Sequence, residues 1–154
     1  MIRRAEKKDI KRIGELLLQV DLVHHNARPD IFKVGRKYSD AELLKIIKDK
    51  SRPILVYTDD ADVVVGYCFS VIMEHKGDSI LSDIRTLYID DLCVDENRRR
   101  EGIGKALYEA ALALAKDEKC YNLTLNVWSC NPDAIRFYES VGLVPQKINM
   151  EIIL

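Results

Sequence analysis

The sequence lacks the features of a membrane or secreted protein. No apolar run approaches the roughly 20 residues of a membrane-spanning helix, and the first residues, MIRRAEKKD, contain no apolar core of signal-peptide length. Its four cysteines form no Cys-x-x-Cys pattern and have no histidine nearby. We therefore expect a cytoplasmic protein with reduced thiols and no metal site.

An excess of charge of either sign is also missing. Lys and Arg total 24 and Asp and Glu total 25, for a formal net charge of -1. No overall field favours nucleic acid or an anionic membrane, and we expect neither as a partner. A chain of 154 residues without internal repeats, low-complexity tracts or linkers predicts a single domain over residues 1–154.

One stretch, LYIDDLCVDENRRREGIGKAL at residues 87–107, changes from a strand pattern to a helix pattern. Its first part, residues 87–94, consists of β-forming residues interrupted by Asp90 and Asp91. From Ile103 onward, apolar residues follow the 3.6-residue period of a helix. The stretch therefore predicts a strand, a turn and a helix.

The turn carries three arginines, at 98–100, and two glycines, Gly102 and Gly104. Glycine lets the backbone come close to a bulky anion, and the exposed amides at a helix N-terminus attract negative charge. The turn predicts a phosphate cradle, with a tight turn and solvated arginines as the alternative. Neither a P-loop nor a dinucleotide fingerprint fits, because Lys105 and Ala106 follow the glycine pair.

The rest of the chain predicts a mixed α/β domain. Further strands are expected at 1–4, 53–57, 63–73, 121–127 and 147–154, and further helices from near Asp9, from Ser39 or Asp40, and over 132–140. Because a helix connects strands 87–94 and 121–127, these two should be parallel neighbours. Residues 26–38 show neither the periodicity of a helix nor that of a strand, which predicts a loop. This loop could form a wall of a substrate pocket or an ordinary surface connection.

A second motif follows in the segment NPDAIRFYESVGL. Asn131, Ala134, Phe137, Tyr138, Gly142 and Leu143 fit its spacing, after the RxxGxG motif of Arg99, Gly102 and Gly104. In this order the two motifs resemble those of the GNAT superfamily of acetyl-CoA-dependent N-acetyltransferases, and the resemblance covers the whole chain. It implies a mixed, mostly antiparallel sheet with splayed central parallel strands, flanked by helices.

The resemblance also implies a binding site for acetyl-CoA. The pantetheine arm would lie between the splayed strands and bond to the backbone of Leu92 and Val94. Carried over position by position, the cofactor-binding residues are Leu92, Cys93, Val94, Arg99, Arg100, Glu101, Gly102, Ile103, Gly104, Lys105, Asn131 and Tyr138. A homodimer is a further expectation, because related proteins often form dimers.

Acetyl transfer to an amine requires two proton movements. An alkylammonium must lose a proton before it attacks, and the thiolate of coenzyme A leaves more easily when it is protonated. Asp90 or Asp91 is the candidate for the first step and Tyr138 for the second. In a regular strand the two aspartates face opposite sides, so only one faces the pocket unless a bulge intervenes. The alternatives are surface carboxylates and a core aromatic residue.

The acceptor is predicted from the same strand. The stretch IDDLCV resembles the IEDLFV-type strand of polyamine and small-amine acetyltransferases, although Asp90 is one methylene shorter than the glutamate usual there. Asn126 stands where the bacterial ribosomal-protein N-terminal acetyltransferases have a glutamate. We therefore expect a small cationic primary amine as substrate. A protein N-terminal or lysine acetyltransferase and an acetyl-CoA-binding module without turnover remain as alternatives.

Overall fold

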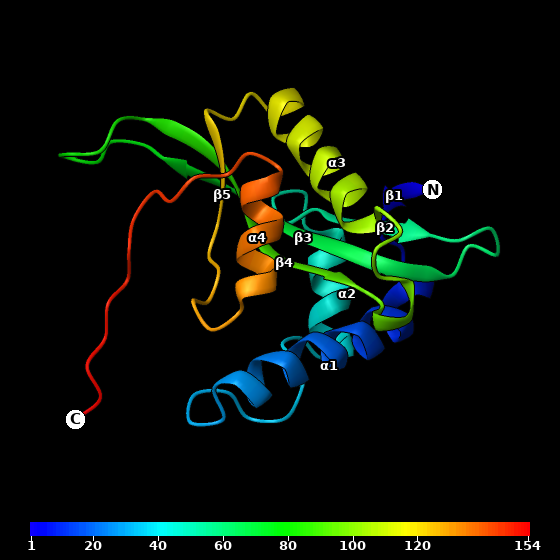
Figure 1. Ribbon diagram of the computed structural model, residues 1–154. Helices are drawn as coiled ribbons and strands as arrows, with labels where there is room; N and C mark the ends of the chain where they lie inside the picture. Colours follow the sequence, from blue (N-terminus) through cyan, green and yellow to red (C-terminus); the bar gives the residue numbers. More distant parts are fainter.

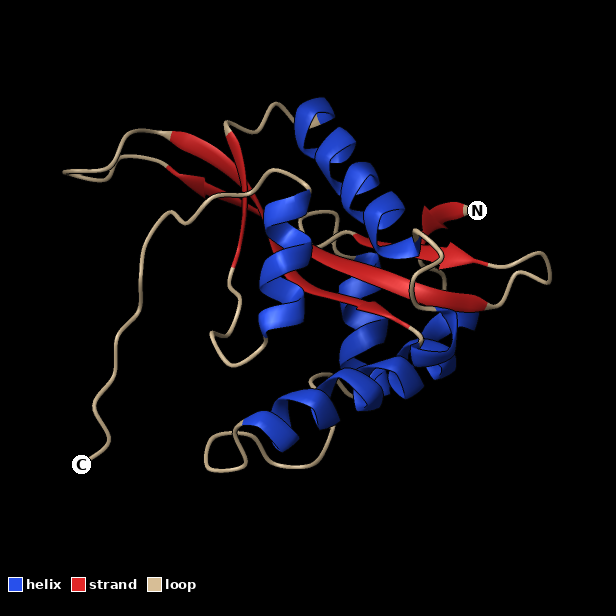
Figure 2. Cartoon of the chain, viewed as in Figure 1, coloured by secondary structure: helices blue, strands red, loops and turns tan.

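The computed structural model describes residues 1–154 as a five-stranded sheet with helices on both faces (Figures 1 and 2). The strands lie in the order in which they occur in the chain: β1 (Ile2–Arg4), β2 (Ile54–Thr58), β3 (Val64–His75), β4 (Ile84–Val94) and β5 (Asn122–Leu125). All neighbours are antiparallel except β4 and β5, which are parallel. The predicted mixed, mostly antiparallel sheet is confirmed.

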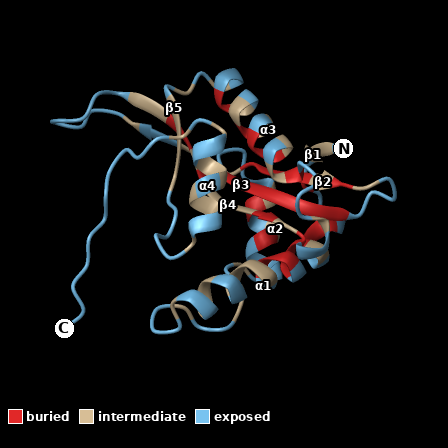
Figure 3. Ribbon diagram, viewed as in Figure 1, coloured by how far each residue is buried: buried red, intermediate tan, exposed pale blue.

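Two pairs of helices cover the sheet. They are α1 (Ile10–Ala27), α2 (Asp40–Lys48), α3 (Ile103–Asp117) and α4 (Pro132–Ser140), with short 3-10 turns η1 (Lys7–Asp9) and η2 (Glu96–Arg98). Apolar residues of α1 and α2 pack on one face, and those of α3 and α4 pack on the other. Figure 3 shows the buried residues concentrated in and beside the sheet. No helix combines the length and hydrophobicity needed to cross a membrane.

Local side-chain hydrogen bonds fix where α2 and α4 begin. Ser39 accepts a bond from the Glu42 amide at 3.3 Å, and the Glu42 carboxylate accepts one from the Ser39 amide at 2.8 Å. The Asn131 side chain accepts a bond from the Ala134 amide at 3.2 Å, and Pro132 occupies the first turn of α4. Both predicted helix starts are confirmed.

The parallel pairing of β4 with β5 covers only part of β4, because β5 ends at Leu125. Their pairing runs from Thr86 with Asn122 to Ile89 with Leu125. Beyond Ile89, residues 91–94 of β4 pair with β3 alone, and Asp90 has no partner in either neighbouring strand. One backbone edge of this part of β4 is thus open toward the gap, as predicted for the splayed strands.

The prediction of a last strand at residues 147–154 is wrong. Residues 144–154 form neither strand nor helix and extend past the sheet as the red end of the chain in Figure 1, with Arg28 after α1 donating a hydrogen bond to Glu151 at 2.6 Å. The alternation of apolar and polar residues is that of a strand, but a strand also needs a neighbouring edge to pair with. The preceding strand is also shorter than the predicted 121–127.

Candidate functional site

The two aspartates of β4 lie on one face of the sheet because the strand contains a bulge. Asp91 and Ile89 pair with two consecutive residues of β3, which leaves Asp90 as an extra residue. Ile89 and Leu92 consequently pack into the same core cluster on the α3 side, and Cys93 packs on the α1 side. A regular strand would place positions 89 and 92 on opposite faces. Both aspartates are therefore directed to the face covered by α1 and α2.

The surroundings of Asp91 raise the pKa of its carboxyl group. It is half-buried, and its Oδ2 accepts a hydrogen bond from the Tyr67 hydroxyl at 2.9 Å. Removal from water raises the pKa of Asp91 to about 6, against the lowering effects of the Tyr67 hydrogen bond and the positive charge of Lys37. At neutral pH the carboxylate is charged and can still take up a proton at modest cost.

Asp90 is already engaged by two neighbours. Its Oδ1 accepts a bond from Lys37 Nζ at 2.8 Å and its Oδ2 one from the Tyr38 hydroxyl at 2.6 Å. Arg52 in turn donates to the Tyr38 hydroxyl at 3.1 Å. The charge of Asp90 is thus compensated by Lys37, whereas Asp91 makes no ion pair.

The loop before α2 contributes to this site. Lys37 and Tyr38 come from its last residues, and Phe32 packs edge-on against Trp128 with ring centroids 5.1 Å apart. The loop therefore contacts both the segment that follows β5 and Asp90 in the bulge of β4. This is the position expected of a pocket wall. Sequence reasoning missed Lys37, Tyr38 and Tyr67, because no periodicity or motif marks them.

Tyr138 approaches the same place from α4. Burial raises its pKa, and the charge of Asp91 raises it further. The phenol therefore stays protonated at neutral pH and can donate a proton. Its hydroxyl makes no hydrogen bond within the protein. The charge of Asp91 thus acts on the Tyr138 phenol, although no hydrogen bond joins the two residues.

The turn between β4 and α3 has the form of an anion cradle. Gly102 has a φ of 78°, a left-handed conformation that favours glycine. The first backbone hydrogen bond of α3 joins the Ala106 amide to the Gly102 carbonyl at 3.0 Å. The amides of residues 103–105 therefore have no hydrogen-bond partner within the helix. Arg98 pairs with Glu101 at 2.9 Å, whereas the arginines at 99 and 100 are exposed and make no ion pair.

Cys93 is another of the residues predicted to bind the cofactor. The side chain of Cys93 points away from it, because its thiol donates to the Leu16 carbonyl at 3.7 Å and burial raises the pKa of that thiol to about 12. Only the backbone of Cys93 is therefore available to a ligand.

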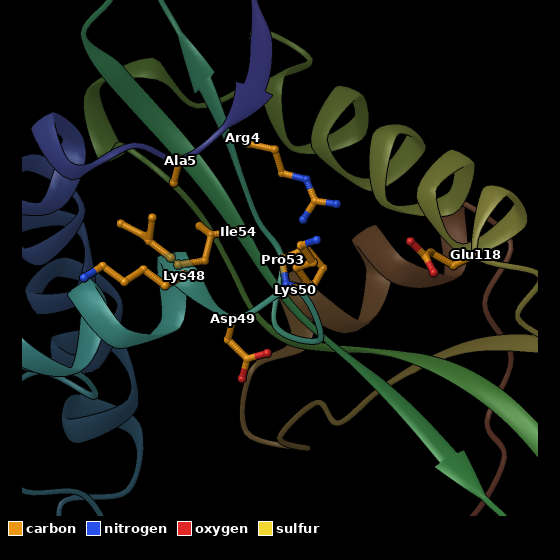
Figure 4. A pocket seen from close by; sticks show the side chains of 9 residues that line it. Arg4, Ala5, Lys48, Asp49, Lys50, Pro53, Ile54 and Glu118 are labelled. Carbon is orange, nitrogen blue, oxygen red and sulfur yellow. The ribbon is translucent and has the colours of Figure 1, made fainter.

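A separate surface hollow of about 300 Å³ lies elsewhere (Figure 4). Basic and acidic side chains mix in its lining, which consists of Arg4, Ala5, Ile47, Lys48, Asp49, Lys50, Pro53, Ile54 and Glu118. It contains none of the predicted site residues. We place the candidate site at Asp90 and Asp91 of β4, because Lys37, Tyr38 and Tyr67 converge on these two carboxylates.

Comparisons with known proteins agree with this architecture. The acetyltransferase (GNAT) family matches residues 3–143 of the chain. Peptidyl-lysine N-acetyltransferase YjaB of Salmonella typhimurium is 34% identical over 104 residues, and the match covers 66% of this chain and 59% of the relative's length.

Solved structures resemble the whole chain. A mutant of the BH1408 protein from Bacillus halodurans has a TM-score of 0.96 at 30% identity, over 100% of this chain and 99% of that one. An aminoglycoside N-acetyltransferase in complex with CoA has a TM-score of 0.75 at 14% identity, over 100% and 98% of the two chains. The second likeness concerns the fold alone.

Proposed function

The chain belongs to the GNAT family of acetyltransferases, and from this premise we propose that it transfers the acetyl group of acetyl-CoA to an alkyl primary amine. One observation carries the proposal. Asp91, a carboxylate with a pKa raised to about 6, lies close enough to the protonated phenol of Tyr138 to raise its pKa. The pair can accept one proton and donate another at the same pH.

The proposed reaction uses the two groups in sequence. Asp91 first takes up one proton of the bound alkylammonium, directly or through a water molecule, and later releases it to solvent. The neutral amine nitrogen then attacks the thioester carbonyl to form the new C–N bond. As the C–S bond breaks, Tyr138 donates its proton to the departing thiolate of coenzyme A, and the second proton of the nitrogen passes to the Tyr138 oxygen and restores the phenol. The amides at residues 103–105, which lack a backbone hydrogen-bond partner, and the exposed arginines at 99 and 100 would hold the pyrophosphate of the cosubstrate.

The acceptor we propose is a small cationic amine. A carboxylate next to the reacting carbon favours an ammonium group for binding and then accepts its proton. The contact between Lys37 and Asp90 supports this choice, since an alkylammonium group already lies 2.8 Å from one of the two carboxylates. The same contact removes one of the two negative charges, so the preference for polycations should be weaker than two free carboxylates would give.

Peptidyl lysine is the second candidate acceptor. The similarity to YjaB favours it, and a lysine side chain presents the same alkylammonium as a small amine. Because that match spans 59% of the relative's length, its substrate is carried here as a proposal alone.

A thiol-release screen tests the proposed function. Coenzyme A release would be followed with diamines, polyamines, amino acids, aminoglycosides, lysine-containing peptides and peptides with a free N-terminus. We expect diamines or polyamines to give the highest kcat/KM. If a lysine peptide or a free N-terminus exceeds every small amine by about tenfold, the protein-acetyltransferase alternative replaces the small-amine proposal. Binding of acetyl-CoA without release for any acceptor would identify a non-catalytic module.

The cradle predicts that Gly104→Val weakens acetyl-CoA binding. A β-carbon at Gly104 would lie 3.6 Å from Phe137 and Val94, an ordinary contact, but the two γ-methyls of valine would crowd the amides beside it. We expect the dissociation constant measured by calorimetry to rise by about tenfold or more, equivalent to about 1.4 kcal/mol.

Gly104→Ala is the matched control, because it adds only the tolerated β-carbon. It should bind acetyl-CoA more tightly than the valine variant. Thermal unfolding of both variants checks that the fold is intact. An unchanged affinity in folded Gly104→Val protein would remove the cradle from the cofactor site.

A further inference from the structure

The ammonium group of Lys37 lies beside the two aspartates to which the proposed function assigns the acceptor amine. Its Nζ donates to the Asp90 carboxylate at 2.8 Å and to the Asp90 carbonyl oxygen at 3.1 Å. Asp90 is the extra residue of the bulge and pairs with neither neighbouring strand, so this carbonyl has no strand partner. The lysine thus contacts the backbone of β4 itself, at the residue that precedes Asp91.

The charge of Lys37 also acts on Asp91, the proposed base. Burial raises the pKa of the Asp91 carboxyl group, and the positive charge of Lys37 acts against that rise. No other lysine of the chain forms an ion pair with either aspartate. One alkylammonium of the protein itself therefore interacts with both carboxylates of the site.

Tyr38 anchors the backbone at this point, whereas the side chain of Lys37 can move. The Tyr38 ring stacks on Phe69 with centroids 5.5 Å apart, and its hydroxyl donates to Asp90 at 2.6 Å. The side chain of Lys37 is 42% exposed, compared with 16% for Asp90, and a lysine nitrogen is carried on a flexible four-carbon stem. The nitrogen can therefore leave Asp90 while the loop stays in place.

We propose that the protein acetylates its own Lys37, an inference that rests on the proposed function. Asp91 takes up one proton of the Lys37 ammonium, and the neutral Nζ attacks the thioester carbonyl of acetyl-CoA. The C–N bond forms and the C–S bond breaks, while Tyr138 protonates the departing thiolate and recovers the second proton of the nitrogen. The products are N-acetyl-Lys37 and free coenzyme A. Because the acetylated side chain carries no charge, Asp90 loses its ion-pair partner.

The position of Lys37 distinguishes it from the other lysines of the chain. A nucleophile held beside the reacting groups reacts faster than one that must meet them from solution. Lys33, four residues earlier in the same loop, is exposed and forms no ion pair or side-chain hydrogen bond. Uncatalysed acetylation by acetyl-CoA should therefore label Lys33 at least as fast as Lys37, whose nitrogen is held by Asp90. A preference for Lys37 identifies catalysis at the site.

Site-resolved mass spectrometry tests the proposal. The protein would be incubated with acetyl-CoA carrying a ¹³C-labelled acetyl group, without added amine, and the label at each lysine followed over time. We expect label to appear at Lys37 at least about tenfold faster than at Lys33. In Asp91→Asn and in Tyr138→Phe, the rate at Lys37 should fall by about 10²-fold, whereas the rate at Lys33 should not change. Equal rates at the two lysines, or an unchanged Lys37 rate in both folded variants, would overturn the proposal.

A mixture of chains tests whether each molecule modifies itself. Wild-type chains of natural isotope content would be incubated with ¹⁵N-labelled Tyr138→Phe chains and acetyl-CoA. Self-acetylation predicts acetyl-Lys37 on the light chains alone. Equal acetylation of Lys37 on the heavy chains would show transfer to another molecule and would contradict the proposal.

A parallel reaction with the best amine from the screen separates this inference from the proposed function. If N-acetylamine forms while Lys37 stays unlabelled, self-acetylation is overturned and the proposed function stands. If neither the amine nor Lys37 is acetylated, both are overturned.

Discussion

Asp91→Asn is expected to lower kcat/KM for the best amine by at least about 10²-fold and to raise the free energy of unfolding at neutral pH. Asparagine keeps the shape of the side chain and can still accept the hydrogen bond from Tyr67, but it cannot take up a proton. A residue with a merely structural role would lose stability when changed. Activity and stability should therefore move in opposite directions.

The pH dependence follows from the direction of the pKa shift. Burial raises the pKa of Asp91 to about 6, above its value in the unfolded chain, so the folded state binds more protons between about pH 4 and pH 6. The associated stability is present below about pH 4 and is lost as the pH rises through 6. In urea unfolding, Asp91→Asn should be more stable than wild type by about 1 to 3 kcal/mol at pH 7.5 and by much less at pH 4. Wild-type kcat/KM should fall below pH 6, where the base becomes protonated.

Asp90→Asn is the matched control for the charge removed. Its substitution leaves the ammonium of Lys37 without its partner and weakens the bond from Tyr38, so the free energy of unfolding should fall. The loss of kcat/KM should be smaller than for Asp91→Asn. If Asp90→Asn instead causes the larger loss of activity, the roles of the two aspartates are reversed.

Tyr138→Phe should lower kcat by about 10²-fold or more with little change in the affinity for acetyl-CoA. The substitution preserves the aromatic ring and deletes a hydroxyl that makes no hydrogen bond within the protein. The free energy of unfolding should therefore stay the same. Steady-state kinetics and calorimetry separate the two quantities. Tyr108→Phe, at a buried position on α3, removes an equivalent hydroxyl away from the site and should leave kcat unchanged. Near-normal turnover in the Tyr138 variant would return this residue to a packing role.

Helix starts and strand positions were predictable because they depend on local pattern. Ser39 with Glu42 and Asn131 with Pro132 are signals contained within four residues, and both mark the observed starts. The resemblance of two motifs supplied the splay of β4 and β5, which no local periodicity encodes.

The bulge of β4 at Asp90 could not be predicted, because it depends on how β3 pairs with β4. Only the register shows that Asp90 is the extra residue, which directs both aspartates to one face. The Tyr67 hydroxyl reaches Asp91 from 24 residues away, and Lys37 belongs to a loop without periodicity. The last strand failed for a related reason, since residues 147–154 carry the right alternation but no edge within the chain receives them.

Direct identification of the product tests acetyl transfer through Asp91 and Tyr138 most sharply. The protein would be incubated with acetyl-CoA carrying a ¹³C-labelled acetyl group and the best amine from the screen, and the amine analysed by mass spectrometry. The proposed function predicts labelled N-acetylamine in equal amount to the coenzyme A released, at a rate that falls by about 10²-fold or more in Asp91→Asn and in Tyr138→Phe. Labelled product formed by both folded variants at the wild-type rate would contradict it.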